Sequence, residues 1–234
     1  MEFMQLIQTT DFWLGLLKII WINILLSGDN DVVIALAARG LPAKEQKQAI
    51  IIGSGFAVVL LVALTMAAAW LMGLQGLQII GGLLLLWIGA QLLVEEEEED
   101  PEAKHHASLM AAVRTILIAD LVMSLDNVIG VAASAKGDQL LLVLGLAVSI
   151  PLVVFGSSLM INIMQRFPLL IVLGAALIGW VGGETIANDV LLQTLTESNE
   201  WIRTAMAIAG AGVVIAWGRW MEHKNAANTK DLAA

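Results

Sequence analysis

The sequence predicts an all-α polytopic membrane protein, on three observations: its composition, seven long apolar stretches and an internal repeat. Of its 234 residues, 59% are hydrophobic and 14% are charged, and the mean hydropathy is +0.83. Soluble domains are about 45–50% apolar and about 25% charged, so an ordinary soluble domain and a disordered chain are both excluded. The 12 Lys and Arg are scattered and there is no cysteine, which excludes a nucleic-acid-binding face and a disulfide framework.

Seven apolar stretches reach the roughly 20 residues that a helix needs to cross a bilayer. Their connections are short, so we predict a single transmembrane domain over residues 1–234. Pro168 stands at the start of the sixth stretch, where a first-turn proline is tolerated. The seven predicted helices cover residues 12–38, 47–72, 75–94, 108–135, 139–163, 168–187 and 201–220.

The stretch NILLSGDNDVVIALAARG at 23–40 reappears as DLVMSLDNVIGVAASAKG at 120–137, with a constant offset of 97 residues. Apolar matches between membrane segments arise by chance, but a shared S-x-D-N motif with a terminal basic-Gly pair does so far less easily. The offset aligns the first three predicted helices with the next three. Because each unit has an odd number of spans, the second unit has the opposite orientation in the membrane. We therefore predict an inverted-topology repeat, an arrangement common in secondary transporters. The predicted parts are repeat unit A 11–94, an acidic cytoplasmic loop 95–107, repeat unit B 108–187 and helix 7 at 201–220.

The basic residues are unevenly divided between the two sides of the predicted membrane. With the N-terminus outside, nine of the 12 Lys and Arg fall on the inner side. Only Lys18, Lys136 and Arg203 fall on the outer side. Because Lys and Arg are enriched in cytoplasmic loops, this asymmetry predicts an outside N-terminus and a cytoplasmic C-terminus.

Five carboxylates lie inside predicted spans, whereas the basic residues within spans stand near helix ends. A charged Asp at a helix centre costs about 2.5–3.5 kcal/mol on insertion scales, so these acids must be neutralised. No basic partner is available at that depth, which leaves protons or a metal ion. The five carboxylates are Asp29, Asp31, Asp120, Asp126 and Glu184.

The polar atoms near the two motifs are carboxylate, amide and hydroxyl oxygens. In each copy, three polar residues with i, i+4, i+7 spacing line one face of the predicted helix and form a stripe. Hard divalent ions such as Mg²⁺, Ca²⁺ and Mn²⁺ prefer oxygen ligands, whereas zinc favours imidazole or thiolate. All three histidines lie in a loop or in the tail, so zinc is disfavoured. The two stripes are Asn23, Ser27 and Asn30 in the first copy and Asp120, Ser124 and Asn127 in the second.

On a regular helix, Asp29 would point about 100° away from Asn30. We expect the chain to loosen near Gly28 and Leu125, so that Asp29 and Asp126 converge with the two stripes on one ion near mid-membrane. Irregular backbone at membrane depth is tolerated where it lines a cavity. Gly28 favours such a break in the first copy, and Leu125 gives no equivalent support in the second.

Each proposed ligand also has a purely structural interpretation. Asp29 and Asp126 would then be protonated acids that cap a helix break, and Asn30 and Asn127 would be hydrogen-bond partners between helices. Glu184 stands near the outer end of its helix, where hydration alone would account for it.

Two acidic features stand outside the predicted ligand set. Asp31 has no counterpart in the second copy, where Val128 stands. The run at 95–100 is typical of a solvated loop. The alternative for that run is a cation collector in which His105 and His106 add ligands.

The chain resembles the TerC family of integral membrane proteins, in its short YjbE-like branch. The resemblance rests on ILLSGDNDVVIALAA (24–38), DLVMSLDN (120–127), the acidic loop after the third helix and GGE (182–184). It implies a bacterial inner-membrane protein of metal-ion homeostasis, with manganese export as the leading activity and tellurite resistance as the historical label. Carried over to matching positions, it points to Asp29, Asn30, Asp126 and Asn127 as metal ligands, with Asp120 and Glu184 as further acids. Asn23 departs from its repeat counterpart Asp120, so a symmetric site made only of carboxylates is not expected.

The buried acids and the resemblance together predict an exporter of divalent metal ions, with Mn²⁺ as cargo and no organic cofactor. Moving two charges outward against about 100 mV costs roughly 4.6 kcal/mol, so we expect coupling to inward protons. One alternative is a non-transporting membrane assembly or metal-delivery factor of the tellurite-resistance type. Another is an intramembrane aspartyl protease, which the Asn after each motif Asp disfavours, so we expect no enzyme. Besides the divalent metal ion and membrane lipid, a homo-oligomer and other membrane proteins stay open as partners.

Overall fold

The computed structural model describes residues 13–14, 17, 30–71, 74–94, 109–125 and 139–232, and every regular element within them is helical. The predicted all-α class is therefore confirmed over this part of the chain. The elements are α3 (Ala43–Leu71), α4 (Leu77–Leu93), α6 (Gln139–Arg166), α7 (Leu169–Ala187), α8 (Gln193–Ser198) and α9 (Glu200–Leu232), with further helical residues at 30–38 and 109–125.

Three helical segments are long and apolar enough to cross a membrane, namely Ala43–Leu64, Leu169–Ala187 and Glu200–Lys224. Two shorter apolar helices cover Leu77–Leu93 and Ile150–Arg166. All of these segments coincide with predicted spans. The count of seven spans and the inverted repeat stay predictions, because the two stretches that carry the S-x-D-N motifs are described only in part.

The helix ends differ from the predicted ends mainly after residue 187. α9 continues to Leu232 instead of ending near residue 220, because the polar residues that follow include neither Gly nor Pro to stop the helix. The short helix α8 was not predicted, since its six residues include only one large apolar side chain and carry no apolar period. Pro168 is the N-cap of α7 with φ −56°, close to the φ that proline prefers.

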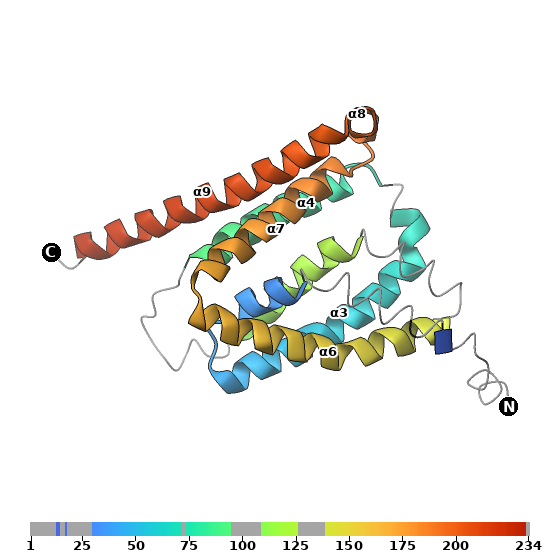
Figure 1. Cartoon of the computed structure of the whole chain (residues 1–234), viewed down its shortest axis with the longest axis horizontal. Helices are drawn as coiled ribbons and strands as arrows, with labels where there is room; N and C mark the ends of the chain where they lie inside the picture. The colour runs from blue at the N-terminus through green and yellow to red at the C-terminus, as the bar shows by residue number, and fades with distance from the viewer. Residues whose placement is uncertain are drawn as a thin grey trace.

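The helices are stacked in layers (Figure 1). α9 lies on one outer side, α4 and α7 form the next layer, the helices at 30–38 and 109–125 lie in the middle, and α3 and α6 lie on the far side. α7 packs against both α4 and α9, and α3 packs against α6. The predicted repeat would make α3 equivalent to α6 and α4 to α7, and α4 also packs against α7.

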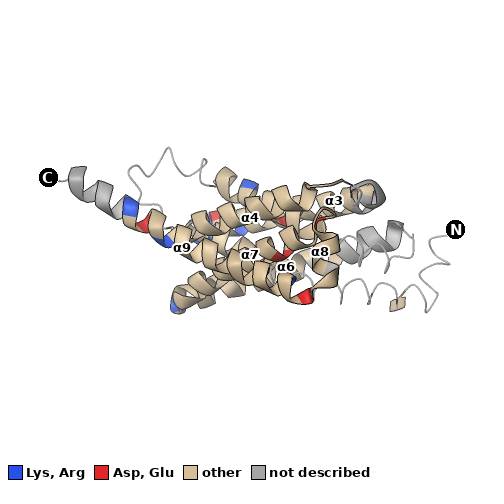
Figure 2. Cartoon of the chain, turned by 90° about the horizontal axis from the view of Figure 1, so that it is seen from above, with Lys and Arg blue, Asp and Glu red and all other residues tan. Residues whose placement is uncertain are grey.

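Charged side chains are few and lie mostly at the ends of the helices. Figure 2 shows most of the described Lys and Arg toward the end of the molecule from which the C-terminal part of α9 projects. Lys44 and Lys47 at the start of α3, Arg166 at the end of α6, and Arg219 and Lys224 of α9 are all exposed. The apolar middle of the stack therefore carries little positive charge among the described residues.

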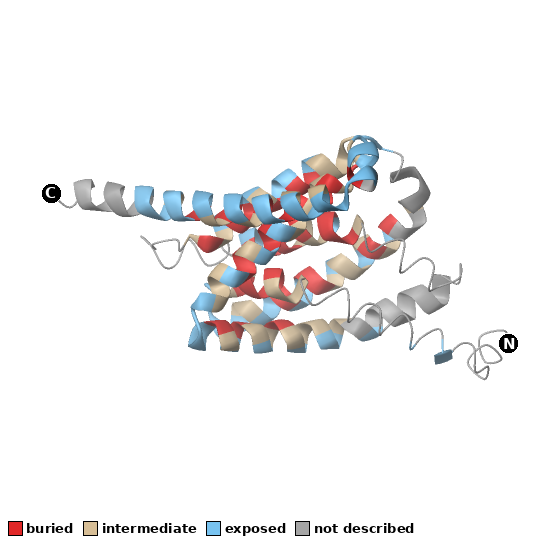
Figure 3. Cartoon of the chain, turned by 45° about the horizontal axis from the view of Figure 1, so that its top comes forward, coloured by how far each residue is buried: buried red, intermediate tan, exposed pale blue. Residues whose placement is uncertain are grey.

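The main hydrophobic core surrounds the two middle helices and draws side chains from every layer except α9. Its fully buried members include Leu36, Ile50, Leu85, Ile116 and Met164. Exposed residues lie along the outward faces of the helices (Figure 3). They include large apolar side chains such as Phe155 and Ile208. Extended exposed apolar surfaces of this kind are typical of membrane proteins.

The backbones of α4, α7 and α9 touch one another at glycines. A Cβ atom added at these positions would overlap a carbonyl oxygen of the facing helix, so only glycine allows the approach. Helix association within lipid depends on such close packing, because lipid tails are as apolar as the side chains. The contacts are Gly82 with Gly182, Gly210 with Gly179, and Gly183 with Met206.

Candidate functional site

The structure places three of the predicted ligands. Asn30 begins the helical residues at 30–38, Asp120 lies within 109–125, and Glu184 lies in the last turn of α7. Leu125, the second residue of the second motif, is the last described helical residue of that segment. The other four predicted ligands lie outside the described residues: Asn23, Asp29, Asp126 and Asn127. Gly28 also lies outside them.

Asp120 is held by a hydroxyl group of its own helix. Ser124 Oγ donates a hydrogen bond to Asp120 Oδ2 over 3.3 Å, across one helical turn. Ser124 is 2% exposed, and the neighbouring Val122 and Met123 belong to the main hydrophobic core. The predicted stripe spacing is thus confirmed for this pair, and it places a carboxylate and a hydroxyl in the middle layer.

Asp31, the residue after Asn30, contacts α6 from the middle layer. Ser157 Oγ donates a hydrogen bond to Asp31 Oδ1 over 3.2 Å. The second carboxylate oxygen of Asp31 lies against Gly156, where an added Cβ would overlap it. The middle layer therefore holds two carboxylates, each fixed by a serine hydroxyl.

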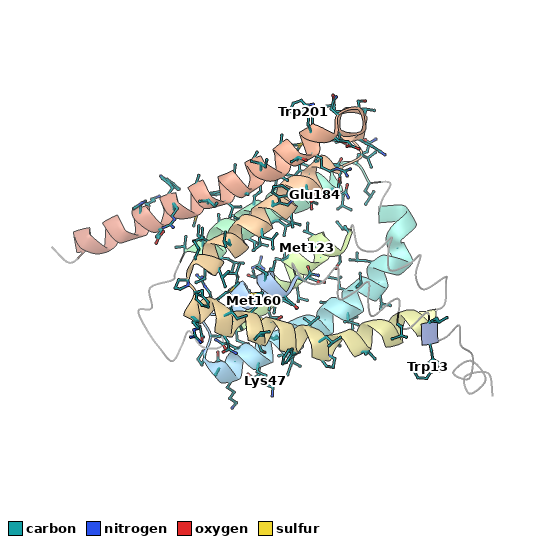
Figure 4. All side chains as sticks on the ribbon, in the orientation of Figure 1. Trp13, Lys47, Met123, Met160, Glu184 and Trp201 are labelled. Carbon is teal, nitrogen blue, oxygen red and sulfur yellow. The ribbon has the colours of Figure 1, made fainter. Side chains whose placement is uncertain are left out.

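Glu184 lies on a different layer from these two acids. Its neighbours Gly182 and Gly183 touch α4 and α9, and Glu184 itself is half-buried. Figure 4 shows Glu184 on α7, apart from Met123 on the middle helix. α4 and α7 both reach the middle layer, since Gly81 of α4 meets Val122 and Gly174 of α7 meets Val32. The described contacts place Glu184 beside α4 and do not join it to Asp120.

The donor chemistry suits a hard divalent ion only when the two motifs are included. Within the described ranges, no three His, Asp or Glu side chains come together in a group that would hold a metal ion. Asp31, Asp120 and the serine hydroxyls supply oxygen donors of the kind that Mg²⁺, Ca²⁺ and Mn²⁺ prefer. A complete ligand shell from this chain would require Asp29 and Asp126.

Asp189, which the sequence did not single out, is a buried carboxylate outside the spans. It is 1% exposed and accepts hydrogen bonds from the backbone N–H groups of Gly76, Gln78, Ile79 and Leu191 at 3.0–3.3 Å. Burial alone would raise the pKa of Asp189, but these four donors outweigh it and hold the pKa below its ordinary value. The N-cap residue of α4 is glycine, with φ 81°, so Asp189 provides the missing cap from the α7–α8 connection.

Comparison with known proteins decides the family. The model of the integral membrane protein TerC family matches residues 8–226. The chain belongs to the TerC family. The "uncharacterized membrane protein YjbE" of Bacillus subtilis (strain 168) is 42% identical over 205 residues, which cover 88% of this chain and 94% of YjbE. The recognition of the family from the S-x-D-N motifs is thereby confirmed, and the chain is an integral membrane protein.

More distant relatives extend the family without adding a stated activity. The "uncharacterized membrane protein YkoY" of B. subtilis is 24% identical over 242 residues, covering 92% of this chain and 75% of YkoY. The "UPF0053 protein YegH" of Escherichia coli (strain K12) is 25% identical over 205 residues, but the chain spans only 38% of its length. No solved structure matches the chain significantly.

Two features of this TerC-family chain escaped the sequence reasoning because their partners are distant. Asp31 and Ser157 are 126 positions apart, and Asp189 and Gly76 are 113 positions apart. The available signals were the Gly156-Ser157 pair within an apolar helix and the absence of a capping side chain at Gly76. Neither signal names its partner without the fold.

Proposed function

We propose that this TerC-family protein exports divalent metal ions, with Mn²⁺ as cargo, across a bacterial inner membrane. The observation that supports the proposal best is Asp120, whose carboxylate is held inside the middle layer by Ser124, the first residue of the second S-x-D-N motif. Apolar helices cover this layer on both sides, so a charged carboxylate there needs a positive partner. A hard metal ion bound between both motifs would provide it.

The proposed ion site combines the described acid with the motif residues. Asp29 and Asp126 supply one carboxylate from each half of the chain, and Asn30 and Asn127 supply amide oxygens. Asp120 and Asn23 occupy matching positions before the motifs. We propose Glu184 on the exit path rather than in this cluster, because it lies in the last turn of α7 and no described contact joins it to Asp120.

Export of a divalent cation requires an energy source. An outward step of two charges against about 100 mV costs roughly 4.6 kcal/mol, which corresponds to a more than thousandfold concentration ratio. We propose that inward protons drive this step, with the acids carrying protons and metal in turn.

The proposed orientation has the N-terminus outside and the C-terminus in the cytoplasm. The exposed basic residues at the start of α3 and at the ends of α6 and α9 then face the cytoplasm, while Arg203 faces outward. This distribution follows the excess of Lys and Arg in cytoplasmic loops.

The proposal is tested with the purified full chain in liposomes that contain a Mn²⁺-sensitive dye. We expect Mn²⁺ flux that accelerates when protons are driven in the opposite direction. Asp126→Asn and Asp120→Asn should lower the flux at least about tenfold, because each removes a charge that balances the ion in an apolar environment. Glu222→Gln is the matched control, since this carboxylate is exposed at the far end of α9.

Three results would change the proposal. Flux that ignores the pH gradient would remove proton coupling. Absence of any flux, while the gene still restores metal tolerance to deletion cells, would favour an assembly or metal-delivery factor. Asp126→Asn flux equal to that of the unmodified chain would exclude the motif site.

A further inference from the structure

Asp31 occupies a distinct place beside the first motif. It directly follows Asn30 at the start of the helical residues 30–38, whose next residues, 33–36, are buried in the main core. Its carboxylate faces α6, so it links the helix of the first motif to an element of the other half of the chain.

α6 receives this carboxylate through two adjacent residues. Ser157, which is fully buried at 0% exposure, donates its hydroxyl to Oδ1 over 3.2 Å. Gly156 leaves the space that Oδ2 occupies, because an added Cβ would overlap this oxygen and come within 3.1 Å of Asp31 Cγ. The Asp31 carboxylate is thus positioned within an apolar layer by the hydroxyl donor of Ser157 and by the absence of a side chain at Gly156.

The internal repeat provides a comparison within the chain. Position 128, which is equivalent to Asp31, is valine. The positions 97 residues before Gly156 and Ser157 are Val59 and Leu60. The acid of the first half and the glycine and serine of the second half that receive it are therefore all replaced by apolar residues at their repeat equivalents, which indicates that the three residues act together.

The same comparison accounts for the mismatch between Asn23 and Asp120. The first half has an amide where the second has the acid Asp120, but it has Asp31 where the second has Val128. Around each motif there are therefore two carboxylates, Asp29 with Asp31 and Asp120 with Asp126. Asp31 and Asp120 also share a feature, since each accepts a hydrogen bond from a buried serine.

We propose that Asp31 is a further carboxylate of the cation site, taking the place of the acid that is absent at Asn23, and that Gly156 and Ser157 are its positioning residues. The inference rests on the proposed transport of a hard divalent ion and names a ligand from the α6 side of the site. The two halves of the site are then equal in charge but different in geometry.

The test is Mn²⁺ binding to the purified full chain in nanodiscs, measured by titration calorimetry. Asp31→Asn keeps an oxygen that accepts from Ser157 but removes the charge, so the affinity should fall about tenfold or more. Ser157→Ala and Gly156→Ala keep the charge but disturb its position, and changes to residues that orient a ligand typically weaken metal binding 10–100-fold. If Gly156→Ala fails to fold, the near-isosteric Asp31→Asn and Ser157→Ala still decide the question.

Matched controls lie close to each change. Ser158 is next to Ser157, but its hydroxyl donates to the Val154 carbonyl oxygen of its own helix at 2.6 Å. Gly55 is a helical glycine of α3 at which an added Cβ meets nothing within 4 Å. Ser158→Ala and Gly55→Ala should therefore bind Mn²⁺ as tightly as the unmodified chain.

A compensating change sharpens the inference. If Asp31 replaces the acid missing at position 23, adding Asn23→Asp to Asp31→Asn should bring the affinity back to within about threefold of the starting value. Unchanged affinity in Asp31→Asn, or a double variant as weak as Asp31→Asn, would overturn the proposal. Failure of the unmodified chain to bind any divalent ion would instead overturn the proposed function, and this inference with it.

Discussion

The outer unit, defined here as α4, α7 and α9, and the inner layers, defined as the helices at 30–38 and 109–125 with α3 and α6, are built in different ways. In the outer unit, backbones touch directly at Gly179, Gly183 and Gly210. In the inner layers, the glycines meet side chains instead, as Gly53 meets Ile116. The outer unit is held by main-chain proximity, and the inner layers are held by side chains that can rearrange.

The buried polar residues follow the same division. The buried serines of the described chain, Ser54, Ser124 and Ser157, are all in the inner layers, two of them bound to carboxylates. In the outer unit, buried Thr185 and Asp189 lie at the end beside α8. Because residues that serve function often reduce stability, the inner layers are where an ion site is expected and the outer unit is where rigidity is expected.

The largest effect should come from placing a methyl group between the backbones of the outer unit. A Cβ at Gly183 would overlap the Met206 carbonyl oxygen, and backbone cannot move aside as a flexible side chain can. We expect Gly183→Ala to lower the free energy of unfolding by about 3 kcal/mol. The eight tryptophans allow thermal unfolding in detergent to be followed by fluorescence.

Gly212→Ala is the matched control for this change, because an added Cβ at this α9 glycine meets nothing within 4 Å. It should leave the melting temperature unchanged or raise it, since alanine favours a helix over glycine. Equal melting temperatures for the two variants would contradict a backbone-limited contact between α7 and α9.

A smaller effect should follow loss of the cap that joins α7 to α4. Asp189→Asn would present an NH₂ group to donors that now meet a carboxylate oxygen, leaving buried N–H groups unsatisfied. We expect a loss of about 2 kcal/mol in the free energy of unfolding at neutral pH. Glu200→Gln, an exposed acid at the start of α9, is the control and should lose less than about 1 kcal/mol.

The pH dependence of stability gives Asp189 a second signature. Its pKa in the folded chain lies below the ordinary value of 3.8, so its contribution is complete above that pH and is lost as the pH falls through the folded pKa. The difference in melting temperature between the unmodified chain and Asp189→Asn should therefore be constant from pH 7 to about 5 and shrink below about 4. A difference that grew on acidification would contradict the lowered pKa.

The sequence predicted the helices whose signal is local and missed the contacts whose signal is not. Unbroken apolar runs placed α4 and α7 within two residues of their ends. The predicted stripe joined Asp120 to Ser124 because both stand on one helix. The cap from Asp189 could not be predicted, because a carboxylate that caps a helix from another connection leaves no pattern at either position.

Asp31 illustrates the same limit within the candidate site. The missing counterpart at Val128 made it look incidental, and only the packing of α6 on the middle layer reveals Gly156 and Ser157 as its partners. The ligand roles of the motif residues remain predictions, because Asp29, Asp126 and Asn127 lie outside the described residues. The period of a regular helix cannot predict where the expected loosening near Gly28 would place these side chains.

The smallest effect should come from the exposed end of α9, which extends the outer unit beyond its packed part. Arg219 and Glu222 form an ion pair at 3.5 Å, and their side chains are 54% and 52% exposed. Exposed pairs of this kind contribute roughly 0.3–0.5 kcal/mol, because water screens the charges and both side chains lose freedom. Arg219→Ala should therefore shift the free energy of unfolding by less than about 0.5 kcal/mol, and raised salt should remove even that. A loss above about 1 kcal/mol would require this end of α9 to be shielded from water, and the contrast between a packed α7–α9 contact and a solvated helix end would then fail.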